Sequence, residues 1–204
     1  AHTIAFPEET GPKLVIKTLN GDRHRSHQDQ LRYAASKRSD IIVLDSYISR
    51  NQLHSLLNEC QIYISLHRSE GYGLTLAEAM ALGKPVIATG YSGNMDFMNS
   101  ENSILVPYNL VPVGDDAFPY AEDARWAQPD IEFAARAIRE LSLDSDKRTL
   151  LGGLALSDVT SQFTMERAAE FTRIRVEYNN KKHPIQKLTK LLKKLRKFGR
   201  RLHF

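Results

Sequence analysis

The fold of this chain is decided by residues 68–89, which read RSEGYGLTLAEAMALGKPVIAT. The pattern predicts a glycine-containing turn, a helix to about Leu82, a second turn, and a strand at 86–88. Gly71 and Gly73 let the backbone come close to a ligand. The free amides of the turn and of the first helical residues converge on one point, and such a point favours an anion such as a diphosphate.

Two glutamates flank that point. Glu70 follows the preceding strand and can reach hydroxyl groups on one side of the anion, whereas Glu78, one turn into the helix, can reach hydroxyl groups on the other. Two carboxylates that only accept hydrogen bonds suit the two polyols of a nucleotide sugar, the hexose and the ribose. The alternative is structural: Thr75 and Glu78 have capping-box spacing, and Glu70 is then an ordinary loop acid.

Short apolar runs alternate with helical patterns on both sides of this stretch. The expected strands are 14–16, 41–44, 62–66, 86–88 and 104–106. In the first half of the chain the expected helices are the end of one at 1–6, one at 26–37 and one that follows a capping box at 49–52. In the second half, one helix is expected to start at Pro129-Asp130, one to cover about 146–156 and one to cover 164–178. Apolar runs separated by helices predict an α/β, Rossmann-like domain whose parallel sheet is covered by helices on both faces. Ligands are then expected at the carboxyl ends of the strands.

Composition sets further limits. The chain has 204 residues, 42% of them hydrophobic, which fits one globular domain with an extension. Its net charge of +4 hides an asymmetry, because residues 181–204 hold ten Lys or Arg and no acid, leaving 18 basic against 24 acidic residues in the rest. A uniformly basic nucleic-acid-binding surface is therefore disfavoured. Cys60 is the only cysteine, which excludes an internal disulfide and fits a reducing compartment, so we expect a cytoplasmic protein.

Metal and other cofactors are not expected. His, Cys, Asp and Glu form no cluster with convincing metal-ligand spacing. Asp144-Ser145-Asp146 imitates a metal-binding Asp-x-Asp, but it precedes a helix far from the glycine turn and is interpreted as an amino-terminal cap.

The whole string around the two glutamates resembles the glycosyltransferase group 1 family, the family 4-like retaining enzymes of the GT-B fold. Their signature is Glu, seven residues and Glu, within Glu-Gly-(Phe/Tyr)-Gly before a helix that ends in Ala-x-Gly-x-Pro-Val, and Glu70 and Glu78 match it. The resemblance covers roughly 1–178 and is densest over 62–107. It implies that 1–178 is the carboxy-terminal, nucleotide-sugar-binding lobe of a two-lobed enzyme, cut at its amino end so that the acceptor-binding lobe is missing.

The resemblance also implies roles for individual residues. Glu70 is the expected catalytic-site residue, contacting the transferred sugar near its reacting carbon, and Glu78 binds the ribose. The diphosphate is held by the backbone amides of Gly71, Tyr72, Gly73, Leu74 and Thr75. The family's phosphate-binding Arg and Lys and its catalytic histidine cannot be placed in this sequence, and His67 is expected to be structural.

Three further residues are weighed against plainer readings. Tyr47 is a candidate for stacking on the base, and the alternative is a half-exposed loop tyrosine. Gly93 would border the sugar end of the cleft, and the alternative is that Gly93-Asn94 merely turns the chain. Trp126 begins a Trp-x-x-Pro-Asp segment similar to one in the mannosyl- and rhamnosyl-type branch of polysaccharide assembly, and the alternative is an aromatic anchor before a helix.

The resemblance implies a metal-independent hexosyltransferase of polysaccharide biosynthesis, such as a mannosyltransferase. It would move the sugar from a GDP-mannose-like or UDP-sugar donor to a glycan or lipid-linked acceptor with retention of configuration. Because catalysis needs both lobes to close over the donor, this lobe alone is expected to bind but hardly turn over. Two rivals stay open: a nucleotide-sugar epimerase of related fold, which would lack the Glu70 to Glu78 pattern, and a non-catalytic nucleotide-sugar-binding or scaffold lobe.

Residues 179–204 form a separate basic tail. Within 184–204, apolar residues recur at intervals of three and four, and Lys and Arg fill most of the other positions. As a helix this segment is amphipathic and cationic, and it is expected to lie on an anionic membrane surface at the inner face. A helix that crosses back onto the missing lobe and a solvated, disordered tail are the alternatives.

Overall fold

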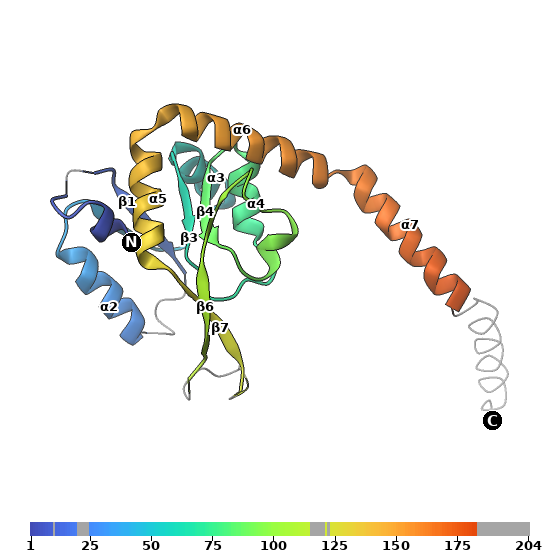
Figure 1. Ribbon diagram of the computed structural model, residues 1–204, viewed down its shortest axis with the longest axis horizontal. Coiled ribbons are helices and arrows are strands. Elements are labelled where there is room, and N and C mark those ends of the chain that lie inside the picture. The colour runs from blue at the N-terminus through green and yellow to red at the C-terminus, as the bar shows by residue number, and fades with distance from the viewer. Residues whose placement is uncertain (10, 20–24, 115–120, 122, 183–204) are drawn as a thin grey trace, which may run out of the picture. The chain divides into compact units, whose positions relative to one another are not determined.

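Five short parallel strands form the centre of the fold in the computed structural model, which describes residues 1–9, 11–19, 25–114, 121 and 123–182 (Figure 1). Strand β1 (Leu14–Thr18) pairs with β2 (Ile41–Asp45), and β4 (Val86–Thr89) lies between β3 (Tyr63–Ser65) and β5 (Ile104–Val106). All five match predicted apolar runs. The parallel strands are divided between a two-stranded and a three-stranded sheet, where the sequence predicted one sheet.

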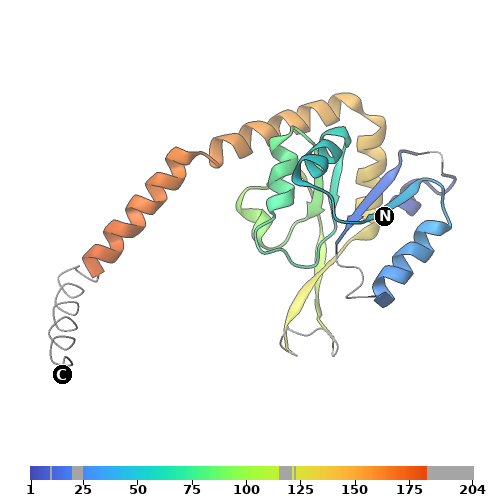
Figure 2. The same cartoon turned by 180° about the vertical axis from the view of Figure 1, so that it is seen from behind.

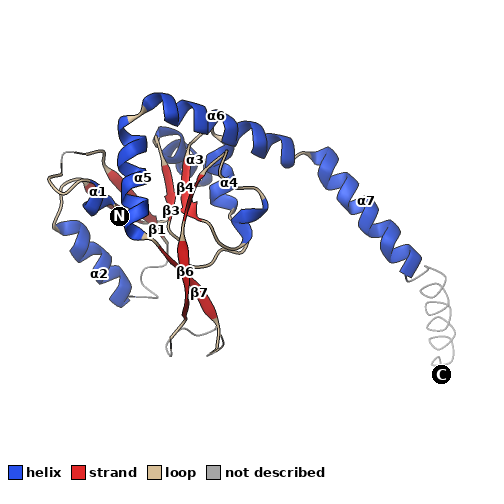
Figure 3. Ribbon diagram, viewed as in Figure 1, coloured by secondary structure: helices blue, strands red, loops and turns tan. Residues whose placement is uncertain are grey.

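Helices join the strands in the alternation that the sequence predicted (Figure 3). The helices of this unit are α1 (His2–Ala5), α2 (Arg25–Ser36), α3 (Arg50–Glu59), α4 (Leu74–Ala81), α5 (Ile131–Leu143) and α6 (Ser145–Gln162). An antiparallel ribbon that the sequence did not predict, β6 (Tyr108–Pro112) with β7 (Arg125–Pro129), stands between β5 and α5. It projects beyond the ends of the parallel strands (Figures 1 and 2).

The sheet β3–β4–β5 is covered on both faces. Ile87 of β4 joins a buried cluster that includes Ala134 and Ile138 of α5. Its neighbours in sequence, Val86 and Ala88, point to the other face and join a second cluster with residues of α4. Successive strand residues alternate between faces, so a fully buried strand such as β4 supplies apolar side chains to both. The prediction of a doubly covered parallel sheet is confirmed here.

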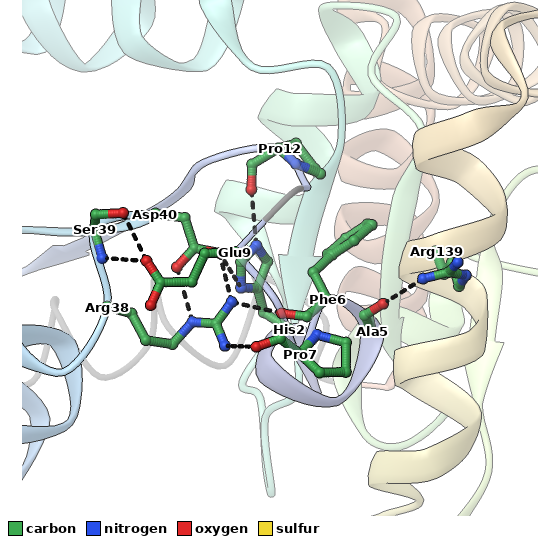
Figure 4. Close-up of polar contacts among 10 residues, drawn as sticks. All are labelled: His2, Ala5, Phe6, Pro7, Glu9, Pro12, Arg38, Ser39, Asp40 and Arg139. Carbon is green, nitrogen blue, oxygen red and sulfur yellow. Dashed lines mark hydrogen bonds and ion pairs between the residues drawn. The ribbon is translucent and has the colours of Figure 1, made fainter.

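Helix α1 is fastened to the rest of the unit by two arginines (Figure 4). The Arg38 guanidinium donates to Oδ1 and Oδ2 of Asp40 at 2.8 and 2.7 Å and to the carbonyl oxygen of Phe6. From the opposite side Arg139 of α5 donates to the carbonyl oxygen of Ala5 at 2.9 Å. The hydrogen bond from Arg38 holds the pKa of the buried Asp40 carboxyl below its usual value. Helix α1 thereby connects the loop before β2, which holds Arg38, to helix α5, which holds Arg139.

Helix caps at Ser49 and Asp144 follow the sequence, and a third lies at Asp130, where the sequence predicted only the start of a helix. Ser49 and Gln52 form the predicted capping box at α3, Asp130 caps α5 by accepting from the Phe133 amide, and Asp144 accepts from the Lys147 amide at the start of α6. The capping box at Thr75, the alternative to a binding role for Glu78, is absent, because Gly73 is the cap residue of α4 and no side chain bonds there. Glu78 is therefore not explained as a capping partner.

A second unit comprises Ser161–Phe204, of which the structure describes residues up to Lys182. Its helix α7 (Met165–Lys182) has no buried residue, and Phe171, Ile174 and Tyr178 are among its exposed apolar side chains. The amphipathic helix predicted for 184–204 lies outside the described residues. No helix in the described part of the chain is long and apolar enough to span a bilayer.

Candidate functional site

The predicted site lies at the carboxyl end of β3, where helix α4 begins. Gly73 adopts φ +90° there, a left-handed conformation that side chains disfavour. A Cβ at Gly73 would also lie 3.0 Å from a methyl carbon of Leu76 and 3.3 Å from Cβ of Asn94. This glycine is therefore required by both backbone conformation and space, as the sequence suggested.

The amino end of α4 is open to an anion. The amides of Leu74, Thr75 and Leu76 have no partner within an α-helix, because the first turn lacks preceding carbonyls. Within the described residues no side chain caps this end, and both Leu74 and Thr75 are exposed. Unpaired amides and the positive end of the helix dipole favour a phosphate group at this position.

Tyr63 of β3 is the residue that interacts with both Glu70 and Glu78. Its hydroxyl forms a hydrogen bond with the Thr75 side chain and lies within electrostatic range of both carboxylates. Burial raises the pKa of the Tyr63 hydroxyl, and the two carboxylates raise it further, against the effect of the hydrogen bond to Thr75. Tyr63 therefore stays protonated at neutral pH. The sequence marked Tyr63 only as a strand residue, and nothing local in it points to this position.

The loop after β4 is clamped onto the turn that contains Glu70. The Ser92 hydroxyl donates to the carbonyl oxygen of Glu70 at 2.7 Å, and the Gly93 amide donates to the same oxygen at 3.1 Å. A Cβ on Gly93 would lie 2.2 Å from the carbonyl oxygen of Gly71, so only glycine permits this approach. Gly93 does more than turn the chain: it allows two loops to touch beside Glu70.

His67 and Asn94 support this clamp. Nε2 of His67 lies 3.0 Å from the carbonyl oxygen of Tyr91 and 3.2 Å from Oδ1 of Asn94, and its Nδ1 lies 3.0 Å from the Ser65 hydroxyl. Asn94 is fully buried and donates to the carbonyl oxygen of Thr89. The sequence read His67 as structural and Gly93-Asn94 as a possible turn, and no local pattern shows that the two segments meet.

Trp126 packs against the residue that precedes the glycine turn. The Arg68 guanidinium lies 4.8 Å from the centre of a Trp126 ring and donates to the Gln128 side chain at 2.8 Å. The Ala127 amide donates to the carbonyl oxygen of Arg68, which joins β7 to the loop that follows β3. The aromatic-anchor reading of Trp126 accounts for these contacts, and Arg68 is a positioned cation at the margin of the site.

The remaining candidates lie at the surface. Tyr72 is 39% exposed and its ring packs against Phe97, while Leu74 is exposed beside the open helix end. Tyr47 follows β2, in the other parallel sheet, and is 88% exposed. Base stacking by Tyr47 stays a prediction. Among the described residues, no three His, Cys, Asp or Glu side chains are grouped to hold a metal ion.

A family model described as "Glycosyl transferases group 1" matches residues 11–111, which include β1 to β5 and both glutamates. The chain belongs to this family. The match spans the open amino end of α4 and the turn that contains Glu70. No curated protein matches the chain at a significant level.

Solved glycosyltransferase structures share the fold of this group 1 chain. HepE of Anabaena, solved with UDP and glucose, superposes with a TM-score of 0.60 at 16% identity, over 87% of this chain and 44% of HepE. Sucrose-phosphate synthase of Thermosynechococcus elongatus gives 0.61 at 20% identity, over 87% and 41%. The carboxy-terminal domain of the group 1 protein LpcC of Francisella tularensis gives 0.56 at 16%, over 81% and 94%. The chain thus spans less than half the length of the first two proteins.

Proposed function

We propose that this chain is the donor-binding lobe of a retaining hexosyltransferase that uses a nucleoside-diphosphate sugar. The observation that carries the proposal is the open amino end of α4 at Gly73, with Glu70 and Glu78 both near the Tyr63 hydroxyl beside it. An anion-binding helix end next to two carboxylates fits a diphosphate between two polyols. Solved structures of the same fold, HepE among them, are complexes with UDP or a UDP-sugar.

The nucleoside diphosphate is the leaving group of the proposed reaction. As its bond to the sugar breaks, negative charge grows on the phosphate oxygens. Amides of the first turn of α4 are already oriented toward that charge, so they stabilise it without reorganising. The α4 amides can supply this stabilisation without a metal ion.

The two glutamates have separate roles in this proposal. Glu78 lies on α4 beyond the anion site and is assigned to the ribose, whereas Glu70 lies in the clamped turn and is assigned to the transferred sugar. Hydrogen bonds to a charged group contribute about 1.5–3 kcal/mol each. Loss of the Glu78 charge should therefore weaken binding of nucleotide and nucleotide sugar alike, and loss of the Glu70 charge should weaken only the nucleotide sugar.

Calorimetric titration tests this assignment. The chain is titrated with UDP, GDP and ADP without metal, and then with UDP-glucose, GDP-mannose or ADP-glucose according to the nucleotide that binds. Glu78→Gln should weaken the nucleoside diphosphate by roughly 10-fold or more, and Glu70→Gln should leave it unchanged while weakening the nucleotide sugar. Glu59→Gln, at an exposed position at the end of α3, is the matched control.

Either of two results would overturn the proposal. If no nucleoside diphosphate binds with saturation, the helix end is not a diphosphate site in this chain. If Glu78→Gln and Glu59→Gln bind equally well, the ribose role of Glu78 is wrong.

The proposal extends to the acceptor, the stereochemistry of transfer and the place where the enzyme works. A donor lobe implies an acceptor lobe, and the fit of this chain to 94% of a carboxy-terminal domain supports that arrangement. We propose a glycan or lipid-linked acceptor, transfer with retention, and attachment of 184–204 to an anionic membrane surface. The basic, regularly spaced sequence of 184–204 supports the membrane part, and a mannosyl donor is supported by the Trp126 segment.

A further inference from the structure

We propose that His67 is a positioning residue that fixes the direction in which the Glu70 carboxylate faces the transferred sugar. It acts through the loop after β4, which it bonds and which is in turn bonded to Glu70. The inference rests on the proposed function, since it deepens the sugar side of the same site.

The hydrogen-bond network fixes how His67 is protonated at its Nε2. The buried Asn94 donates its Nδ2 to the carbonyl oxygen of Thr89, so its Oδ1 is the atom that faces His67. Nε2 of His67 then meets two acceptors, this Oδ1 and the carbonyl oxygen of Tyr91, and must carry a hydrogen. Nδ1 is left to accept from the Ser65 hydroxyl. Both imidazole nitrogens are thus hydrogen-bonded, Nε2 to the loop after β4 and Nδ1 to Ser65 of β3.

The segment held by His67 is in an unusual conformation. Ser92 has φ 81° and ψ −150°, a region that residues other than glycine seldom adopt. Such a conformation persists only where surrounding contacts impose it. Tyr91 and Asn94, on either side of Ser92 in sequence, are the two residues whose oxygens His67 engages. His67 therefore holds both ends of the strained segment.

The strained segment in turn forms hydrogen bonds with the backbone amide and carbonyl of Glu70. The Ser92 hydroxyl donates to the carbonyl oxygen of Glu70 and lies 3.3 Å from its amide as acceptor, and the Gly93 amide donates to the same carbonyl. The Glu70 amide and carbonyl are thus both held by this loop, and its Oε1 accepts from the Gly71 amide at 3.1 Å. The amides of α4 that face the diphosphate have no bond to this loop in the described residues. His67 should accordingly affect sugar binding and leave diphosphate binding intact.

Substitutions at His67 separate these effects. His67→Phe keeps a ring of similar size and removes both nitrogens. His67→Gln supplies a donor near the position of Nε2 and an acceptor for Ser65, whereas His67→Asn is too short to reach Tyr91. His54→Phe, at an exposed position of α3, is the matched control. Each variant is titrated with the nucleoside diphosphate that binds the wild-type chain and with its sugar conjugate, UDP-glucose, GDP-mannose or ADP-glucose.

The expected result is a selective loss. His67→Phe and His67→Asn should weaken the nucleotide sugar by roughly 3- to 10-fold, the value of one hydrogen bond, with the nucleoside diphosphate unchanged. His67→Gln should restore most of the affinity. Equal weakening of both ligands, or no rescue by Gln, would show a general structural role and overturn the proposal.

A second measurement does not depend on any nucleotide. Hydrogen exchange of the Gly93 amide, which is bonded to Glu70, should be faster in His67→Phe than in wild type or in His54→Phe. An unchanged rate overturns the proposal whether or not nucleotides bind. Faster exchange in a chain that binds no nucleoside diphosphate would instead overturn the proposed function, and with it the sugar-directing role, while showing that His67 holds the loop.

Discussion

Replacing Gly93 by alanine should open the contact between the two site loops. The added Cβ would lie 2.2 Å from the carbonyl oxygen of Gly71 and 2.8 Å from Cα of Tyr72, where ordinary contact begins at 3.4 Å. The loops must separate by about 1.2 Å, the difference between 3.4 and 2.2 Å, to relieve the first contact. That movement takes the 3.1 Å bond from the Gly93 amide to Glu70 beyond hydrogen-bonding distance. Both obstacles are backbone atoms, so no side-chain rotation relieves them.

The expected cost of Gly93→Ala is about 1–3 kcal/mol of the free energy of unfolding, the usual range for overpacking. For a chain of this size that corresponds to a fall in Tm of about 2–12 °C. Thermal unfolding followed by circular dichroism measures it, with Gly153→Ala as the control, because a Cβ at Gly153 in α6 meets nothing within 4 Å. A Gly93→Ala protein that melts at or above the wild-type temperature would refute the reasoning.

Three further predictions concern other parts of the chain. Gly152→Ala should lower Tm, because its Cβ would lie 2.1 Å from the carbonyl oxygen of Gly83. The neighbouring Gly153→Ala should raise the free energy of unfolding by up to about 1 kcal/mol, because alanine has the higher helix propensity. Equal changes in Tm at the two positions would contradict the packing of Gly152 against Gly83. The hydrogen bond from Arg38 lowers the pKa of Asp40 in the folded state. The Asp40 carboxylate therefore stabilises the fold fully above its unfolded pKa of about 3.9, and this stabilisation is lost as pH falls through the folded pKa. Tm measured from pH 6 to pH 3 should therefore fall less steeply in Asp40→Asn than in wild type, and parallel curves would refute it. Deleting 184–204 should abolish co-sedimentation with anionic vesicles and have no effect on neutral ones, and unchanged co-sedimentation would remove the membrane proposal.

Much of the site could be predicted because its residues are adjacent in sequence. Gly73 needs a left-handed backbone, and the helix that follows it presents free amides wherever the rest of the chain lies. These are local properties, and the short motif from Glu70 to Glu78 carries them. The predicted strands and the caps at Ser49, Asp130 and Asp144 are also local, since each depends on residues within one turn or one run.

Other features arise only where distant segments meet. Thr75 has capping-box spacing with Glu78, yet the helix begins one residue after Gly73, because a left-handed glycine fixes the entry of the chain there. Tyr63 reaches Thr75 because α4 packs against β3, and no spacing rule relates the two residues. The β6–β7 ribbon was missed because its strands are separated by a long connection with no hairpin signal.

The sequence by itself determined the α/β alternation, the open amino end of α4 and the pair of glutamates, because backbone conformation and hydrogen-bonding capacity are properties of short segments. The tertiary structure alone decided how Glu70 is held. His67 and Ser92 are far apart in sequence, and they act on Glu70 only because β3 and β4 are neighbours in one sheet and their following loops emerge at the same edge. Contacts across that edge depend on how strands pair, which no local pattern encodes.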